Sequence, residues 1–269
     1  MAILAISLCP LLLDSTVVGA SGVVVPPQNP ASDIWAVPAY TFTPKNDHSY
    51  ALPACWTRNA RGTYRIQTTK PQCVRDELAA TNRAQGSEGL GDITLPTNFA
   101  GLSAPDQMLV LTDIERVSRG ETPVLGVSSL ANTLAQQGAL ERTDPTLSPT
   151  VDIAGMTGAF GSNYAAGVNT LDANYEWMYT DGWDAKYTFN GACTSPSSSG
   201  CWGHRDNILI NDSRMPCDTS SCSIIMGGGY VHLGSESYNT YTELFVQTTG
   251  VTPVLTYTWQ EALAAGASP

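Results

Sequence analysis

Residues 200–209 hold the side chains most able to do chemistry, because one of only three histidines in the chain lies among them. Gly203 directly precedes His204, and Asp206 and Asn207 follow before an apolar run. This order predicts a tight turn that leads into a short helix, with His204 near the helix N-terminus. Because the positive end of a helix disfavours an imidazolium, we expect a neutral His204 that can bind a metal or accept a proton. The alternative is a histidine whose hydrogen bonds only hold two loops together.

Few side chains could cooperate with His204. His232 and Tyr230 fall on one face of an expected strand, and Glu243 falls on the strand expected to pair with it. A pairing of His204 with His232 or with Glu243 would make a metal or acid–base site. The chain contains no Gly-x-Ser-x-Gly nucleophile motif and no His-Glu-x-x-His metal motif. The third histidine, His48, falls in a proline-rich segment and is expected to be solvated.

The N-terminus predicts export. Residues 2–13 are nearly all apolar but too few to span a bilayer as a helix, and small residues suited to cleavage follow at 18–20. We therefore expect a signal peptide over residues 1–20, with a buried N-terminal helix as the alternative. No later run is apolar and long enough for a membrane span. A net charge of −11 argues against nucleic acid and anionic membrane surfaces as partners.

The cysteine count agrees with export. Of seven cysteines, Cys9 lies in the expected signal peptide, which leaves the even number that an oxidising compartment favours. A structural zinc cluster is the competing interpretation, but the spacings contain no Cys-x-x-Cys pair. Other pairings are possible, but chain order favours three short-range disulfides: Cys55–Cys73, Cys193–Cys201 and Cys217–Cys222.

Periodic patterns predict an α+β domain in which helices cover a sheet. Prolines at 26, 27, 30, 38, 44 and 53 predict an extended leader, which a disulfide-closed hairpin follows before residue 71. Apolar spacing with caps and stops predicts helices at 71–85, 103–120, 128–138 and 170–180. Residues 143–167 are expected to be turn-rich, and 223–233 and 241–247 to form an antiparallel hairpin. The run Gly227–Gly229 predicts a close backbone approach or a bulge, and residues 251–269 a tail.

The Gly-His-Arg-x-Asn-Ile-Leu sequence at 203–209 resembles the signature of bacterial CAP-domain proteins, a superfamily that includes cysteine-rich secretory, antigen 5 and plant pathogenesis-related proteins. Residues 111–120, 130–138 and 175–179 resemble the helices of that family, and the last two expected strands resemble its closing strands. The resemblance covers roughly residues 103–249. It implies an α-β-α sandwich of CAP type, secretion and a central cleft. The domains are then a signal peptide (1–20), an extension (21–70), a CAP-like domain (71–250) and a tail (251–269).

The chain departs from the family at the cleft, where many members place two histidines and two acids that can hold a divalent metal. His204 matches the second histidine, but no histidine lies at 144–149, where the first is expected. The glutamate of the family's Gly-Glu-Asn segment is missing from residues 164–169, and Glu176 or Asp181 could replace the other acid. The resemblance therefore implies a degenerate metal site with no resident cofactor and at most a weakly bound divalent ion at His204.

The sequence as a whole favours a secreted or cell-envelope binding protein, expected to be monomeric, whose ligand is a lipid, a wall glycan or a protein. Its expected ligand cleft contains Trp202, His204, Arg205, Asn207, Trp177, Tyr230 and His232. The rival hypothesis is a hydrolase in which His204 acts as a base with Glu243, Glu176 or Asp181 as partner. A third possibility is that the His204 turn has a structural role alone.

Overall fold

The structure is a computed structural model, which describes residues 42, 44–45, 49–58, 64–66, 71–147, 156–184, 189–210, 222–234, 238–250 and 253–269. The expected signal peptide, His48 and Cys217 lie outside the described residues. Among the helices of the described part, none has the length and apolar character that crossing a membrane requires.

A five-stranded mixed sheet forms the centre of the molecule, in the order β4-β6-β5-β3-β7. Its strands are β3 (Gly126–Ser128), β4 (Met156–Gly167), β5 (Cys222–Val231), β6 (Asn239–Thr249) and β7 (Leu255–Thr258). The pair β3–β5 is parallel, and the other neighbours are antiparallel. The predicted hairpin of the last two long strands is confirmed, with Gly228 opposite Glu243.

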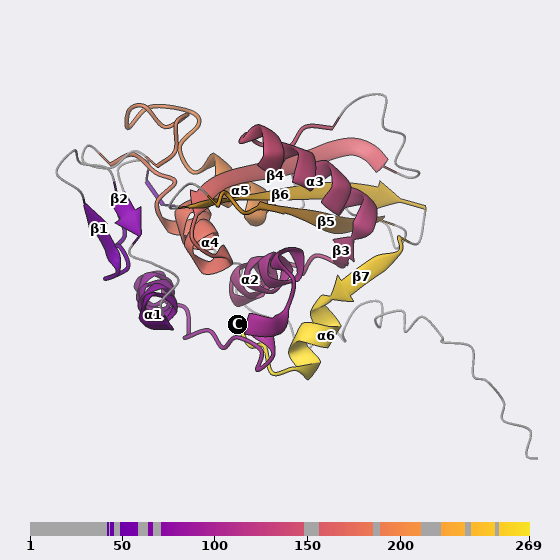
Figure 1. The fold of residues 1–269 in the computed structure, drawn as a ribbon, viewed down its shortest axis with the longest axis horizontal. Helices are drawn as coiled ribbons and strands as arrows, with labels where there is room; N and C mark the ends of the chain where they lie inside the picture. The colour runs from indigo at the N-terminus through magenta and orange to yellow at the C-terminus, as the bar shows by residue number, and fades with distance from the viewer. Residues whose placement is uncertain are drawn as a thin grey trace, which may run out of the picture.

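Helices cover both faces of this sheet (Figure 1). On one face, α3 (Ser129–Glu141) packs on β5 and β6, while α2 (Ala104–Ser118), α4 (Thr170–Tyr179) and α5 (Gly203–Ile208) pack on the other. A further helix, α1 (Pro71–Ser87), packs on α4, and a 3-10 turn, η1 (Phe99–Gly101), precedes α2. The expectation of a mixed helix-and-sheet domain is confirmed.

The three consecutive glycines of β5 allow this layering, because their Cα atoms face the two helical layers in turn. A Cβ on Gly228 would lie 2.7 Å from Cα of Pro105 on α2. A Cβ on Gly227 or Gly229 would lie under 3.0 Å from the backbone of α3. Helices on both faces therefore rest directly on the strand backbone, which confirms the close approach predicted from the glycine run.

Local sequence signals fix several helix starts. The Ser103 hydroxyl accepts a hydrogen bond from the Asp106 backbone N–H at the start of α2, as predicted, and Pro105 occupies the first turn. The Asn169 side chain caps α4 in the same way. Two of the predicted disulfides, Cys55–Cys73 and Cys193–Cys201, are present. The hairpin that Cys55–Cys73 was expected to close pairs β1 (Trp56–Arg58) with β2 (Tyr64–Ile66).

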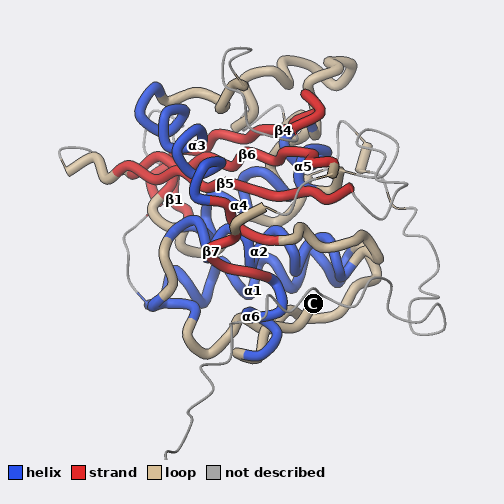
Figure 2. The backbone as a smooth tube through the Cα atoms, turned by 90° about the vertical axis from the view of Figure 1, so that its right-hand side faces the viewer, coloured by secondary structure: helices blue, strands red, loops and turns tan. Residues whose placement is uncertain are grey.

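Two expectations about the fold were wrong. The second half of the supposedly turn-rich stretch 143–167 is β4, whose glycines and alanines carry little strand signal and which is held by pairing with β6. The supposed tail contains β7, which pairs with β3, and α6 (Trp259–Ala264), which packs on α2. Figure 2 shows β7 and α6 at the lower side of the sheet, next to α2. A capping box between Thr258 and Glu261 starts α6, and this signal was overlooked in the sequence.

Candidate functional site

His204 lies in the first turn of α5, as predicted, but the cap of this helix comes from elsewhere in the chain. Trp202 occupies the N-cap position with a left-handed backbone (φ 64°) and gives no side-chain cap. The Oδ2 atom of Asp181 accepts instead, from the backbone N–H of His204 at 2.8 Å and of Arg205 at 3.3 Å. A buried carboxylate beyond the end of α4 therefore satisfies the start of α5.

The imidazole ring of His204 lies between two aspartates. Its Nδ1 atom is 2.6 Å from Oδ1 of Asp181, and its Nε2 atom is 3.6 Å from Oδ1 of Asp144, on the loop after α3. Asp181 is buried, whereas the Asp144 side chain is 51% exposed and the His204 side chain 21%. The Nε2 edge of the ring and the Asp144 carboxylate are thus the part of this arrangement that a ligand can reach.

The two carboxylates make His204 a cation at neutral pH. Burial lowers the pKa of the ring, but hydrogen bonding and charge from Asp144 and Asp181 outweigh it and raise the pKa from 6.5 to about 10. The expectation of a neutral His204 is therefore wrong. The helix N-terminus does disfavour an imidazolium, but two carboxylates, one at each ring nitrogen, have the larger effect.

Glu176 lies on α4, is half-buried and interacts electrostatically with His204. Burial raises its pKa from 4.5 to about 8, against the opposing effect of the His204 charge. At neutral pH the carboxyl group is thus protonated and able to donate a hydrogen bond. Of the three acids considered for His204, Asp181 contacts the ring directly, and the His204 charge lowers the pKa of Glu176 and of Glu243.

Glu243 belongs to a buried network beneath α5. Its Oε1 accepts from the Thr112 hydroxyl at 3.0 Å, and its Oε2 accepts from the Asn163 amide at 3.3 Å. Asn207 on α5 donates in turn to Oδ1 of Asn163 at 3.1 Å. Burial raises the pKa of Glu243 to about 8. The Glu243 side chain therefore links α2, β4 and β6 in the interior, and its buried carboxyl group is not accessible to a ligand.

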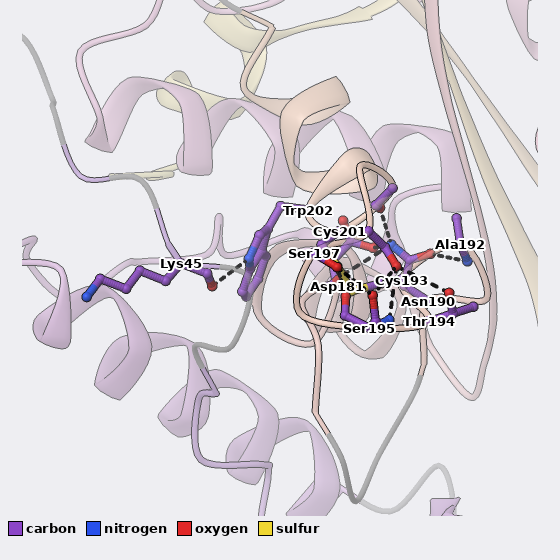
Figure 3. Close-up of a disulfide and its surroundings, with 12 residues drawn as sticks. Lys45, Asp181, Asn190, Ala192, Cys193, Thr194, Ser195, Ser197, Cys201 and Trp202 are labelled. Atoms are coloured by element: carbon purple, nitrogen blue, oxygen red, sulfur yellow. Dashed lines mark hydrogen bonds between the residues drawn. A yellow bond between two sulfur atoms is a disulfide. The ribbon is translucent and has the colours of Figure 1, made fainter.

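Arg205 and Trp202 hold the turn in place. The Arg205 guanidinium is buried, donates to the Met178 carbonyl and to Glu88 at 2.8 Å, and lies over the Trp202 ring. The Trp202 indole is also buried and donates to the Lys45 carbonyl at 2.9 Å, as Figure 3 shows. The expected ligand-facing role of these two side chains does not match their burial.

The remaining members of the expected cleft are dispersed. Trp177 is a core residue whose indole N–H donates to the Tyr164 carbonyl. His232 is bonded to Asn239 at 2.7 Å rather than to His204, and the Tyr230 ring packs on Tyr241. A shallow open depression lies nearby, but His204 does not line it; its walls are Ser49, Tyr50, Leu52, Tyr179, Thr180, Gly182, Asp184 and Phe189.

The Nε2 atom of His204 and the Oδ1 atom of Asp144 could share a metal ion. A separation of 3.6 Å between Nε2 and the Asp144 oxygen suits two ligands of one ion, with Asp181 orienting the ring from Nδ1. Within the described residues, the Cys55, Cys73 and Glu77 ligand atoms also lie within 4.8 Å of one another, but both sulfurs are bonded in a disulfide. Any divalent ion held by this pair would have to displace the proton on Nε2.

Asp144 was missed in the sequence because only a histidine was sought at that place, and an acid in a loop carries no local signal. Its role depends on where the loop after α3 returns in space. Comparison of the chain with protein-family models, with curated proteins and with solved structures finds no match in any of the three.

Proposed function

We propose that this chain is an extracellular CAP-like domain that binds a hydroxyl-rich ligand, a wall glycan, at the exposed edge of the Asp144–His204 pair. The observation that carries the proposal is this pair: a half-exposed carboxylate acceptor lies 3.6 Å from a partly exposed imidazolium donor. Neighbouring acceptors and charged donors of this kind suit sugar hydroxyls, which both donate and accept. The Gly-His-Arg motif and the helices on both faces of the sheet support the CAP-like part, and the two disulfides support secretion.

The surroundings favour a glycan over a lipid. The apolar side chains that the cleft was expected to offer, Trp177 and Trp202, are buried. In the described part of the chain, the large exposed hydrophobic side chains lie on segments other than α5: Leu130, Leu140, Tyr230, Val254 and Leu263. A lipid chain needs a continuous apolar surface, and none adjoins His204 among these residues.

The same geometry weighs against a hydrolase in which His204 is the base. A general base must be free of its proton near the working pH, whereas the pKa of His204 is raised to about 10. Each ring nitrogen also faces a carboxylate. Binding therefore accounts for the arrangement better than proton abstraction does.

Calorimetric titration of the secreted chain with soluble wall-glycan fragments tests the proposal. Saturable binding should be lost in Asp144→Asn and in His204→Gln. It should persist in Asp92→Asn, which removes an exposed carboxylate elsewhere. Binding that survives both site variants would place the ligand elsewhere. Binding to neutral phospholipid vesicles without any glycan binding would refute the glycan class.

A further inference from the structure

Asn190 is a buried side chain whose polar atoms are all engaged around Asp181. Its Nδ2 atom lies 2.7 Å from Oδ1 of Asp181, 3.1 Å from the Asp181 carbonyl and 2.8 Å from the Gly200 carbonyl. Its Oδ1 atom accepts from the Ala192 backbone N–H at 2.8 Å. Figure 3 shows Asn190 and Asp181 close together beside the Cys193–Cys201 disulfide.

Asn190 and His204 share one acceptor atom. Oδ1 of Asp181 receives the Asn190 amide at 2.7 Å and faces Nδ1 of His204 at 2.6 Å. Oδ2 of the same carboxylate accepts the backbone N–H groups of His204 and Arg205. The carboxylate is thus held at both oxygens, and Asn190 is the side-chain donor on Oδ1 that does not belong to α5.

The loop that follows Asn190 is itself fixed. The Cys193–Cys201 disulfide closes it, and the Asn190 carbonyl accepts from the Cys193 backbone N–H. A Cβ on Gly200 would lie 2.6 Å from the Ala192 side chain, so the two ends of the loop touch. Asn190 can therefore transmit the position of this closed loop to Asp181.

We propose that Asn190 is a positioning residue for the His204 site: it orients the Asp181 carboxylate so that Nδ1 of the ring is bound and Nε2 is turned toward Asp144 and the ligand. This inference rests on the proposed function for the role of the site. The inference concerns the orientation of the His204 ring, however, so its test requires no ligand.

The first test uses the unchanged protein and NMR. Because the two side chains share Oδ1 of Asp181, loss of the His204 proton should change the chemical shift of the Asn190 carboxamide. The carboxamide carbon of Asn190 should titrate with the same midpoint as His204, near pH 10. The buried carboxamide of Asn174, on α4, serves as the control and should not follow it. An Asn190 carbon that does not follow the His204 titration would overturn the proposal.

The second test is substitution. Asp181→Asn removes the opposite charge at Nδ1 and should lower the pKa of His204 by roughly one to three units. Asn190→Ala leaves that charge in place and removes only its orientation, so it should lower the pKa of His204 by less. Asn174→Ala, an equally buried change, should leave that pKa unaltered. An unaltered pKa of His204 in a folded Asn190→Ala protein would show that Asn190 only supports the loop. If that variant does not fold, the titration of the unchanged protein decides. If both tests give the expected results but the unchanged protein binds no glycan, the proposed function is refuted and the role of Asn190 stands.

Discussion

Nε2 of His204 and Oδ1 of Asp144 lie 3.6 Å apart, although the two residues are far apart in the sequence and belong to different layers. Asp144 follows the helix on one face of the sheet, and His204 begins a helix on the other. The pair therefore joins the two helical layers at the edge of the sheet.

Asp144→Asn should lower the pKa of His204 from about 10 toward its ordinary value of 6.5. The decrease should be incomplete, because Asp181 still faces Nδ1 at 2.6 Å. An NMR titration of the imidazole carbons measures the shift, and Asp92→Asn is the matched control. An unchanged His204 titration in Asp144→Asn would show that Asp144 does not act on the ring in solution.

Zinc should bind weakly, and its affinity should rise with pH. Each metal ion must displace the proton on Nε2, so the affinity should increase about tenfold per pH unit between pH 7 and 8.5. Calorimetry of the secreted chain measures this, and His204→Ala or Asp144→Asn should abolish the binding. Zinc affinity that is independent of pH, or retained in both variants, would locate the metal on other residues.

Glu243→Gln should stabilise the protein increasingly as the pH rises. The pKa of Glu243 is about 8 in the folded state against 4.5 ordinarily, so between these values the unfolded chain loses a proton that the folded chain keeps. In this window the group lowers stability by about 1.4 kcal/mol per pH unit, and the decrease ends above pH 8. The glutamine side chain does not titrate, so it removes this pH dependence of stability. It keeps the contacts with Thr112 and Asn163, because the Thr112 hydroxyl can accept as well as donate.

Urea unfolding at pH 5, 6.5 and 8 measures the difference between Glu243→Gln and the unchanged protein. Glu141→Gln, an exposed change on α3, is the control and should show no such trend. Parallel pH profiles for the protein and its Glu243→Gln variant would mean that Glu243 is ionised in the folded state.

Gly228→Ala should destabilise the fold by about 1–3 kcal/mol, the usual effect of forcing an extra carbon into a packed layer. The new Cβ would lie 2.7 Å from Cα of Pro105, a backbone atom that can move only with α2. Gly86→Ala, in α1 with open space around it, should be neutral or slightly stabilising. Equal urea midpoints for the two variants would contradict the packing described for β5.

The sequence predicted the parts of the fold that depend on local signals. The cap at Ser103 and the glycine run of β5 concern neighbouring residues or unusual composition, so their patterns could be read directly. The strand β4 could not be recognised, because its small residues become a strand only through pairing with β6. Likewise, β7 depends on β3, which lies far away in the chain.

In the candidate site, too, local sequence signals predicted some features and tertiary contacts decide the others. The place of His204 at a helix start was predictable from Gly203 and the residues that follow. Its charge was not, because that charge is set by Asp144 and Asp181, which reach the ring only through the fold. Tertiary contacts also decide that Arg205 faces Glu88 in the interior rather than a ligand.

The order of the strands has a consequence for how the chain acquires its structure. The central strands β5 and β6 lie at residues 222–249, whereas the helices that flank them, α2 and α3, end by residue 141. During synthesis these helices have no sheet to cover until most of the chain has been made. Folding must therefore be late and dominated by contacts between distant segments, which makes it slow. The fold of this chain therefore stays incomplete until residues 222–249 have been made.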